Sequence, residues 1–263
     1  MRRTLAASAI ALLFASVVFA QQIWMGGGRT RPRWAQLADF DGQFMYCRGA
    51  FSGNWTTDYP GADNNFSIRL AELTRIQVKF DEDRQPHHIV VPLDDPLMYR
   101  CPMVFMENPG SMELSDDEVA SLRDYLMRGG FIWVDDFWGT SQWEQWESQI
   151  ARVLPPNEFP IIDLPITHPI MHMLYDVKDF MQVPNINFWY QSGKQTSERG
   201  RDSAEVHYRG IQNARGDLIV MITHNTDVAD TWEREGEYSE YFNTFSPRGY
   251  AIGVNVVLYA MTH

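Results

Sequence analysis

Residue types that could bind a ligand or catalyse a reaction follow four short apolar runs of this sequence. They are Asn54, Trp55, Asp58, Glu107, Asn108, Asp135, Asp136, Trp138, His224, Asn225 and Asp227, with Asp230, Trp232 and Glu233 close behind. If the apolar runs are parallel strands, these side chains gather beyond the carboxyl ends of the strands, where open α/β sheets bind ligands. Carboxylates and amides would hydrogen-bond a ligand there, and indoles would stack on its apolar face. The sequence therefore predicts a ligand-binding rim.

The same rim supports hydrolysis as an alternative. Asp135 or Glu107 would be the general base and His224 its partner. Oxygen and imidazole donors that a divalent cation accepts are also present, namely Asp135, Asp136, His224 and Asp227. Their spacing is not diagnostic of a metal site, and the sequence has no His-Glu-x-x-His motif. The residues alone assign no catalytic residue, no metal ligand and no cofactor, and they leave open whether the protein is an enzyme.

Each rim residue also has a structural interpretation. Asp135 and Asp136 are suited to capping a helix, and residues 107–110 have the composition of a turn. Residues 224–227 resemble an Asx turn. The two tryptophans could be core residues, since large aromatic side chains dominate burial in most domains. The rim as a set is harder to explain in this way than any single member.

Two further candidates lie outside the rim set. Ser111 is in a loop of the kind that can hold a nucleophile, but no Gly-x-Ser-x-Gly motif surrounds it. His168 and His172 are four residues apart, a spacing that places two side chains on one helical face. Pro169 disfavours helical geometry at His168, so this pair is predicted to pack rather than to bind a metal.

The elements that must position these residues alternate along the chain. Apolar runs predict strands at 44–47, 76–80, 89–91, 103–106, 131–134 and 218–223, and helical spacing predicts helices over 63–73, between Ser115 and Gly129, and between Ser141 and Pro155. Capping boxes, Ser115 with Glu118 and Ser141 with Glu144, mark two helix starts. Residues 251–262 suit a strand or a helix, and residues 191–203 read as an exposed polar loop. The alternation predicts an α/β fold with an open, mostly parallel, doubly wound sheet and helices on both faces.

The composition fits a single globular domain. The chain has 263 residues, 44% of them hydrophobic and 13% aromatic, with two cysteines, which excludes collagen-like, disordered and disulfide-framework proteins. One α/β domain over residues 40–263 is the expectation at this length. The 34 acidic and 22 basic residues give a net charge of -12. This charge argues against a nucleic-acid partner, because phosphate binding needs clustered Lys and Arg.

The first 20 residues resemble a secretory signal peptide. Arg2 and Arg3 precede an uncharged apolar run over 5–20 that ends in Ala20. The run is too short to span a bilayer, which needs about 20 apolar residues, and no later segment approaches that length. We therefore predict an exported protein of the bacterial periplasm or cell envelope, with a flexible Gly- and Arg-rich leader over 21–39. An uncleaved anchor is the alternative.

The two cysteines are predicted not to form a disulfide. Cys47 falls near the end of one predicted strand, and Cys101 falls just before the start of another. If these strands are parallel neighbours, the two residues lie about five positions apart, or roughly 16 Å at ~3.3 Å per residue. A disulfide needs Cα atoms within about 7 Å of each other.

A set of motifs is spread over nearly all of residues 40–262. They are residues 54–66 with 69–74, 93–96, 114–137, 164–170, 253–255 and 259–262. The set resembles an uncharacterised bacterial family, domain of unknown function 4159. The resemblance implies a flavodoxin-like fold related to class I glutamine amidotransferase-like domains, and a helix at the C-terminus. Domains of that group act as amidotransferases, proteases or carbohydrate-associated modules, but here the loop 107–110 lacks the nucleophilic cysteine of the amidotransferases.

The residues and the resemblance together predict a non-catalytic module of the bacterial envelope. Its rim would bind a small molecule, a saccharide or an envelope protein. A hydrolase, with or without a metal, is the alternative at the same rim.

Overall fold

The computed structural model describes residues 31–263, and one compact unit runs from Arg33 to His263. The predicted signal peptide over 1–20 and residues 21–30 of the predicted leader lie outside the described residues. Within the rest of that leader, Trp34 forms a bridge with Val90, and Arg33 pairs with Asp39 at 2.6 Å. These contacts connect residues 33–39 to the sheet.

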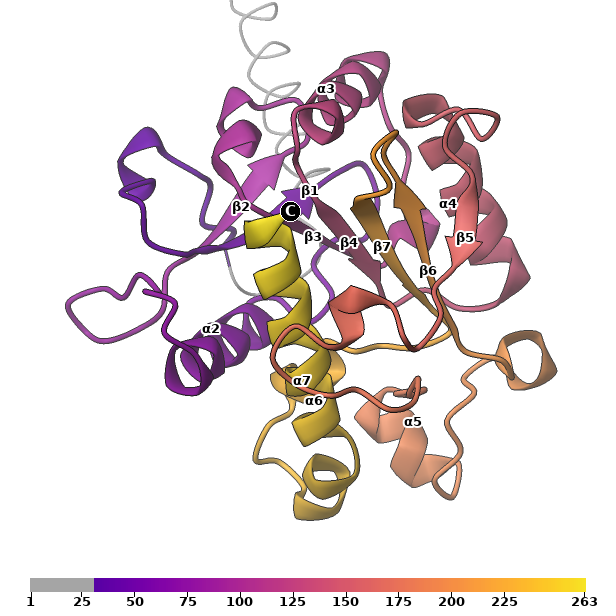
Figure 1. The fold of residues 1–263 in the computed structure, drawn as a ribbon. Helices are drawn as coiled ribbons and strands as arrows, with labels where there is room; N and C mark the ends of the chain where they lie inside the picture. Colours follow the sequence, from indigo (N-terminus) through magenta and orange to yellow (C-terminus); the bar gives the residue numbers. More distant parts are fainter. Residues whose placement is uncertain (1–30) are drawn as a thin grey trace, which may run out of the picture. The chain divides into compact units, whose positions relative to one another are not determined.

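A seven-stranded mixed sheet forms the centre of this unit, in the order β2-β1-β3-β4-β7-β6-β5 (Figure 1). The strands are β1 Tyr46–Ala50, β2 His88–Pro92, β3 Val104–Glu107, β4 Ile132–Asp135, β5 Ile161–Asp163, β6 His207–Gln212 and β7 Leu218–His224. The neighbouring strands β2, β1, β3, β4 and β7 all pair parallel. Strand β6 pairs antiparallel with β7 on one side and with β5 on the other. The predicted α/β class with an open, mostly parallel sheet is confirmed. The parallel strands follow a flavodoxin-like order, but the antiparallel edge makes that likeness loose.

Helices and 3-10 turns connect the strands. The helices are α2 Gly61–Leu73, α3 Asp116–Met127, α4 Gly139–Val153, α5 Ile186–Gln191, α6 Asp230–Glu233 and α7 Ser239–Thr262, and the 3-10 turns are η1 Leu37–Asp39, η2 Pro96–Arg100, η3 Pro109–Ser111, η4 Pro169–Met171 and η5 Gly200–Ser203. The helix expected at the C-terminus is α7. Within residues 31–263, no helix combines the length and the apolar character needed to cross a membrane.

Helix α3 begins and ends as its sequence predicts. Ser115 and Glu118 form a reciprocal capping box, in which each side chain accepts from the backbone N–H of the other residue. Gly129 has a φ of +97° just beyond the helix end, a conformation that residues with a Cβ rarely adopt. The local signals were sufficient here because capping involves residues only a few positions apart.

Helix α4 begins two residues before its predicted cap at Ser141, so that capping box is wrong. The first amides of α4 are instead satisfied by side chains from distant segments. Asn225 Oδ1 accepts from Gly139 N at 2.7 Å, and Asp202 Oδ2 accepts from Thr140 N at 3.0 Å. A capping box cannot be read correctly from local sequence when tertiary partners perform the same role.

Three other sequence predictions differ from the structure. Residues 76–80 form only isolated bridges, Val78 with Phe44 and Phe80 with Pro86, and not a strand. The predicted polar loop over 191–203 contains η5, and its Ser203 is buried. The antiparallel strands β5 and β6 were not predicted, because β5 is only three residues long and the apolar residues of β6 are interrupted by His207, Arg209 and Gln212.

Successive side chains of each strand point to opposite faces of the sheet, and this divides the core into two clusters, one on each face. The first core cluster joins Tyr46, Phe105 and Trp133 to residues of α2 and α7. The second core cluster joins Cys47, Val104, Ile132 and Val134 to residues of α3 and α4. Glu107 follows Phe105 by two positions and Asp135 follows Trp133 by two. Both acids therefore point to the side of the first core cluster.

Cys47 and Cys101 form a disulfide with a Cα–Cα distance of 6.1 Å, so the prediction of no bridge is wrong. Strand β1 begins two residues later than predicted, which places Cys47 near its start. Cys101 directly follows η2 and precedes Pro102, so the chain at this point is not a straight extension of β3. An early Cys47 in β1 and a bend at Pro102 before β3 both bring the two cysteines closer together than the predicted strands would.

Candidate functional site

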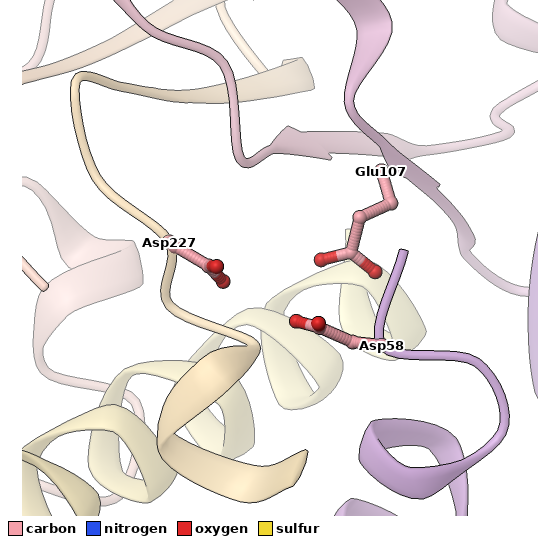
Figure 2. A group of neighbouring side chains, drawn as sticks. All are labelled: Asp58, Glu107 and Asp227. Atoms are coloured by element: carbon pink, nitrogen blue, oxygen red, sulfur yellow. The ribbon is translucent and has the colours of Figure 1, made fainter. Parts of the chain in front are cut away.

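Carboxylates from three distant segments converge at the carboxyl end of the sheet. Asp58, Glu107 and Asp227 each offer an oxygen, and these oxygens lie within 4.8 Å of one another. Figure 2 shows the three side chains pointing toward a common space from three different segments. Asp58 also belongs to a second such group with Asp230 and Glu233 of α6. We call Asp58, Glu107, Asp227, Asp230 and Glu233 the acidic cluster.

The strand order explains where the acidic cluster forms. The chain passes from β1 to the outer strand β2 and then to β3 on the other side of β1. Connections diverge at such a switch point and leave a crevice at the carboxyl ends of the strands. Glu107 is the last residue of β3, Asp58 lies between β1 and α2, and Asp227 lies between β7 and α6. Each acid therefore belongs to a segment that leaves the sheet at the same end.

Left-handed backbone conformations mark the same strand ends. Asn108, Asp136 and Asn225 directly follow β3, β4 and β7 and have φ values of 47°, 53° and 61°, and Asp58 has a φ of 60°. Asn and Asp adopt this region more readily than other residues with a Cβ. Such backbone strain often occurs at functional sites. Here it turns the chain sharply at the end of each strand, directly beside the residues of the rim.

Arg48 is the buried counter-ion of this region. Its guanidinium donates to Asp63 through Nε and Nη2 and to Glu107 Oε2 through Nη1, the latter at 2.5 Å. Nη1 also donates to the carbonyl of Thr57 at 3.0 Å. Because Thr57 precedes Asp58, one fully buried arginine fixes two members of the acidic cluster. Arg48 was not predicted from the sequence as a site residue, although it is the only charged residue in the apolar run 44–51.

Several oxygens of the acidic cluster accept no hydrogen bond from any described residue. Glu107 Oε1, Asp58 Oδ2 and Asp230 Oδ1 are buried atoms of this kind. Asp227 uses Oδ1 to accept from Asp230 N at 2.8 Å. A buried polar atom without a partner costs roughly 1 to 3 kcal/mol, and more when it is charged. Such oxygens therefore need either a proton or a positively charged ligand.

The pKa values of the cluster show the same demand for positive charge. Burial raises the pKa of the Asp58, Glu107, Asp227 and Asp230 carboxyls well above their usual range. Neighbouring carboxylates raise these pKa values further, and Arg48 opposes the rise at Glu107. A bound cation would stabilise the ionised forms in place of protons.

Asp135 and Asp136 stand beside the cluster as structural supports. Asp135 is fully buried, and both its oxygens are used: Oδ1 accepts from Thr223 Oγ1 at 2.5 Å and Oδ2 from Ala229 N at 3.0 Å. Asp136 Oδ1 accepts from Trp138 Nε1 at 3.0 Å. Burial raises the pKa of Asp135 to about 7 and that of Asp136 to about 6. Asp135 thereby anchors the segment that carries Asp227.

The two rim tryptophans offer no open stacking surface. Trp55 and Trp138 are only 2% and 4% exposed. Trp55 packs between Trp34 and Tyr59 with ring centroids 6.0 and 6.1 Å away. Both indoles therefore have the structural role that the sequence left open as an alternative.

The remaining rim amides lie outside the acidic cluster. Asn54 is exposed, and its Nδ2 donates to Thr57 Oγ1 at 3.4 Å. Asn108 follows Glu107 and has a buried Oδ1 that accepts no hydrogen bond within residues 31–263. Asn225 is used at the start of α4, as described above. Of the predicted binding residues, the structure thus brings together Asp58, Glu107 and Asp227, and it adds Asp230 and Glu233.

His224 lies on the other side of the sheet from the acids. Thr223 points to Asp135, so the next residue of β7 points to the opposite face. There His224 lies 4.8 Å from Phe137 and 5.0 Å from Trp143 by ring centroids, and it stacks with His207 at 5.7 Å. We call these four residues the His224 aromatic cluster. His224 is therefore not the partner of Asp135 or Glu107 that the hydrolase interpretation requires.

The histidine pair His168 and His172 has local roles. His168 caps η4 by accepting from Ile170 N, and His172 contacts Asp176 at 2.9 Å. His168 is half-buried beside Tyr259, whereas His172 is exposed, so the prediction that the pair packs holds only for His168.

Fold and site together define an α/β protein with a buried acidic cluster at the switch point of its sheet. The chain belongs to the family described as Domain of unknown function (DUF4159), whose family model matches residues 43–261. This membership confirms the resemblance drawn from the motifs. A search of the curated proteins finds no match for this chain.

Proposed function

We propose that the protein is a binding module whose rim holds a hard divalent cation at Asp58, Glu107 and Asp227. One observation carries the proposal: three carboxylates meet within 4.8 Å, and buried oxygens of Glu107 and Asp58 accept no hydrogen bond from the described residues. Mg²⁺, Ca²⁺ and Mn²⁺ prefer carboxylate oxygens. The cation would lower the cost of holding three like charges together.

The donor set favours these hard cations over zinc. The group Asp58, Glu107 and Asp227 contains neither histidine nor cysteine. Zinc sites in proteins commonly include imidazole or thiolate ligands. His224 cannot supply the imidazole, because its side chain packs in the His224 aromatic cluster.

The geometry supports binding better than hydrolysis. A hydrolase would need a general base within reach of a water molecule or substrate at the cation. Glu107, one candidate base, would itself be a ligand of the cation. Asp135, the other, has both oxygens occupied, and His224 lies on the opposite face. A ligand with oxygen donors, such as a saccharide or a carboxylate group of an envelope partner, could complete the coordination of the cation without any of these groups.

Thermal unfolding of the purified chain with Ca²⁺, Mg²⁺ or Mn²⁺ tests the proposal. A cation at 100 times its dissociation constant stabilises a protein by about 2.7 kcal/mol. We expect such a shift for the natural chain and its loss in Asp227→Asn. His224→Gln is the matched control, because it changes a polar residue at the end of β7 on the other face, and it should retain the shift. No shift with any of the three cations would contradict the proposed function.

We also propose that the protein is exported to the periplasm or cell envelope. The signal-like pattern over residues 1–20 supports this, and so does the disulfide between Cys47 and Cys101, since disulfides persist mainly in oxidising compartments. Mass spectrometry of protein from its native host should find an N-terminus at Gln21 and no free thiol. Retention of Met1 together with two free thiols would contradict export by a cleaved signal.

A further inference from the structure

We infer that the acidic cluster binds two divalent cations that share Asp58. The first is the cation proposed above at Asp58, Glu107 and Asp227, so this inference rests on the proposed function. The second would be held by Asp58, Asp230 and Glu233, whose ligand oxygens also lie within 4.8 Å of one another.

The shared residue makes a bridged pair geometrically reasonable. Asp58 is the only member of both groups, and a carboxylate has two oxygens with which to contact two cations. Paired cations in proteins lie about 3.5 to 4 Å apart, a separation that one carboxylate can bridge. Asp58 Oδ2 is buried and accepts no hydrogen bond from residues 31–263, so it is available to a cation.

Asp230 gives a separate indication of a ligand at the second position. Its side chain is fully buried. Oδ2 accepts from Ile186 N at 2.8 Å, which fixes the orientation of the carboxylate, and Tyr241 Oη, which donates to the carbonyl of Pro184 at 2.8 Å, lies 3.3 Å from the same oxygen. Oδ1 accepts no hydrogen bond from the described part of the chain. The fold thus holds one oxygen of Asp230 in place and leaves the other for a different partner.

The charge of the region agrees with two cations. The five carboxylates of the acidic cluster and the adjacent Asp63 face two arginines, Arg48 and Arg234. With all these carboxyls ionised, a net charge of minus four remains. One divalent cation would leave half of it uncompensated in a largely buried region, where unpaired charge is costly. Two divalent cations would neutralise it while Arg234 stays in place, and would leave a single negative charge once Arg234 moves toward Glu237.

Arg234 is a displaceable counter-ion at the second position. Its Nε lies 2.5 Å from Glu233 Oε2 and 3.8 Å from Asp230 Oδ1. It is partly exposed, and its Nη1 already contacts Glu237 Oε1 at 3.2 Å. Arg234 can therefore shift toward Glu237 when a cation takes its place between Glu233 and Asp230. The second cation should bind more weakly than the first because it competes with this arginine.

Binding of Mn²⁺ to the full chain distinguishes the two sites. Isothermal titration should give two Mn²⁺ per chain, and the electron paramagnetic resonance spectrum should show exchange coupling between the two ions. Asp230→Asn and Glu233→Gln should each leave one Mn²⁺ with an uncoupled six-line spectrum. Arg234→Gln should tighten the second site roughly three- to tenfold by removing its competitor. The exposed Asp83→Asn is the control and should behave as the natural chain.

The outcomes separate this inference from the proposed function. One uncoupled Mn²⁺ per natural chain would overturn the second cation and leave the first. Two uncoupled ions would overturn the sharing of Asp58. Absence of Mn²⁺ binding by a chain with a normal circular dichroism spectrum would overturn both proposals. Glu233→Gln keeps the test decisive if Asp230→Asn unfolds, because Glu233 is partly exposed and Asp230 is not.

Discussion

The acidic cluster and the His224 aromatic cluster lie at the same end of one sheet, yet they have opposite physical characters. In the first, Glu107, Asp58 and Asp230 hold buried oxygens without hydrogen-bond partners in residues 31–263. In the second, a neutral imidazole is enclosed by aromatic rings and donates from Nε2 to the carbonyl of Gly139 at 3.2 Å. Its buried Nδ1 also accepts no hydrogen bond within residues 31–263, but this nitrogen carries no charge. Burial raises the carboxyl pKa values in the first and lowers the pKa of His224 to about 4 in the second.

This difference shows that position at a strand end does not by itself make a binding residue. His224 and Glu107 both end strands, and both were predicted to bind a ligand. Only Glu107 points to the crevice at the switch point, because side chains alternate between faces along each strand. A demand for an external partner arises where charge is buried in excess, and the aromatic side has no such excess.

Removal of the counter-ion should give the largest contrast between the two regions. Arg48→Met leaves Asp63 and Glu107 buried without compensation, which should lower the free energy of unfolding by about 3 to 5 kcal/mol. His224→Phe keeps the ring packing and should change it by less than about 1.5 kcal/mol. Urea denaturation measures both values. Equal losses in the two variants would mean that Arg48 does not hold the acidic side together.

The pH dependence of stability should have opposite signs for Asp135, which stands beside the acidic cluster, and for His224 in the aromatic cluster. The pKa of Asp135 rises from 3.8 to about 7, so the folded state binds more protons than the unfolded state between these values. Its contribution is greatest below pH 4 and is lost as the pH rises toward 7. The pKa of His224 falls from 6.5 to about 4, so its contribution is present above pH 6.5 and is lost as the pH falls toward 4.

Denaturation curves measured at roughly one-unit pH steps, from about pH 4.5 to about pH 7.5, can separate the contributions of Asp135 and His224. Asp135→Asn should remove the loss of stability with rising pH, and His224→Phe should remove the opposing gain. The two variants should therefore change the slope of stability against pH in opposite directions. A change in the same direction would contradict the assignment of the two pKa shifts.

Asn108 and Asn225, the two asparagines with left-handed backbone at strand ends, should give the smallest difference in stability. Asn108→Gly relieves a φ of 47° and removes an oxygen that accepts no hydrogen bond within residues 31–263, so stability should change by less than about 1 kcal/mol. Asn225→Gly also relieves a positive φ but removes hydrogen bonds to Gly139 N and Glu205 O, each at 2.7 Å. It should cost about 1 to 3 kcal/mol more than Asn108→Gly. Thermal unfolding of the two variants side by side is the measurement.

The sequence by itself determined the local features of this protein. The α/β class followed from alternating apolar runs and helical stripes, and the start of α3 followed from Ser115 and Glu118. The positions of Glu107, Asp58 and Asp227 after apolar runs were sufficient to predict them as rim residues. These features depend on residues close together in the chain, and their physical causes, capping and periodicity, operate over a few positions.

Tertiary structure alone decided which rim residues meet. Because side chains alternate between faces along a strand, Glu107 at the end of β3 and His224 at the end of β7 point to different faces of the sheet. The register of β1 with β3 brought Cys47 near Cys101. Arg48 became the counter-ion of Glu107 because β1 and β3 are neighbours, and Asp58 became the common member of both carboxylate groups because its loop crosses the switch point. Register and face depend on the packing of the whole sheet, and a shift of one residue reverses the direction of every side chain in a strand.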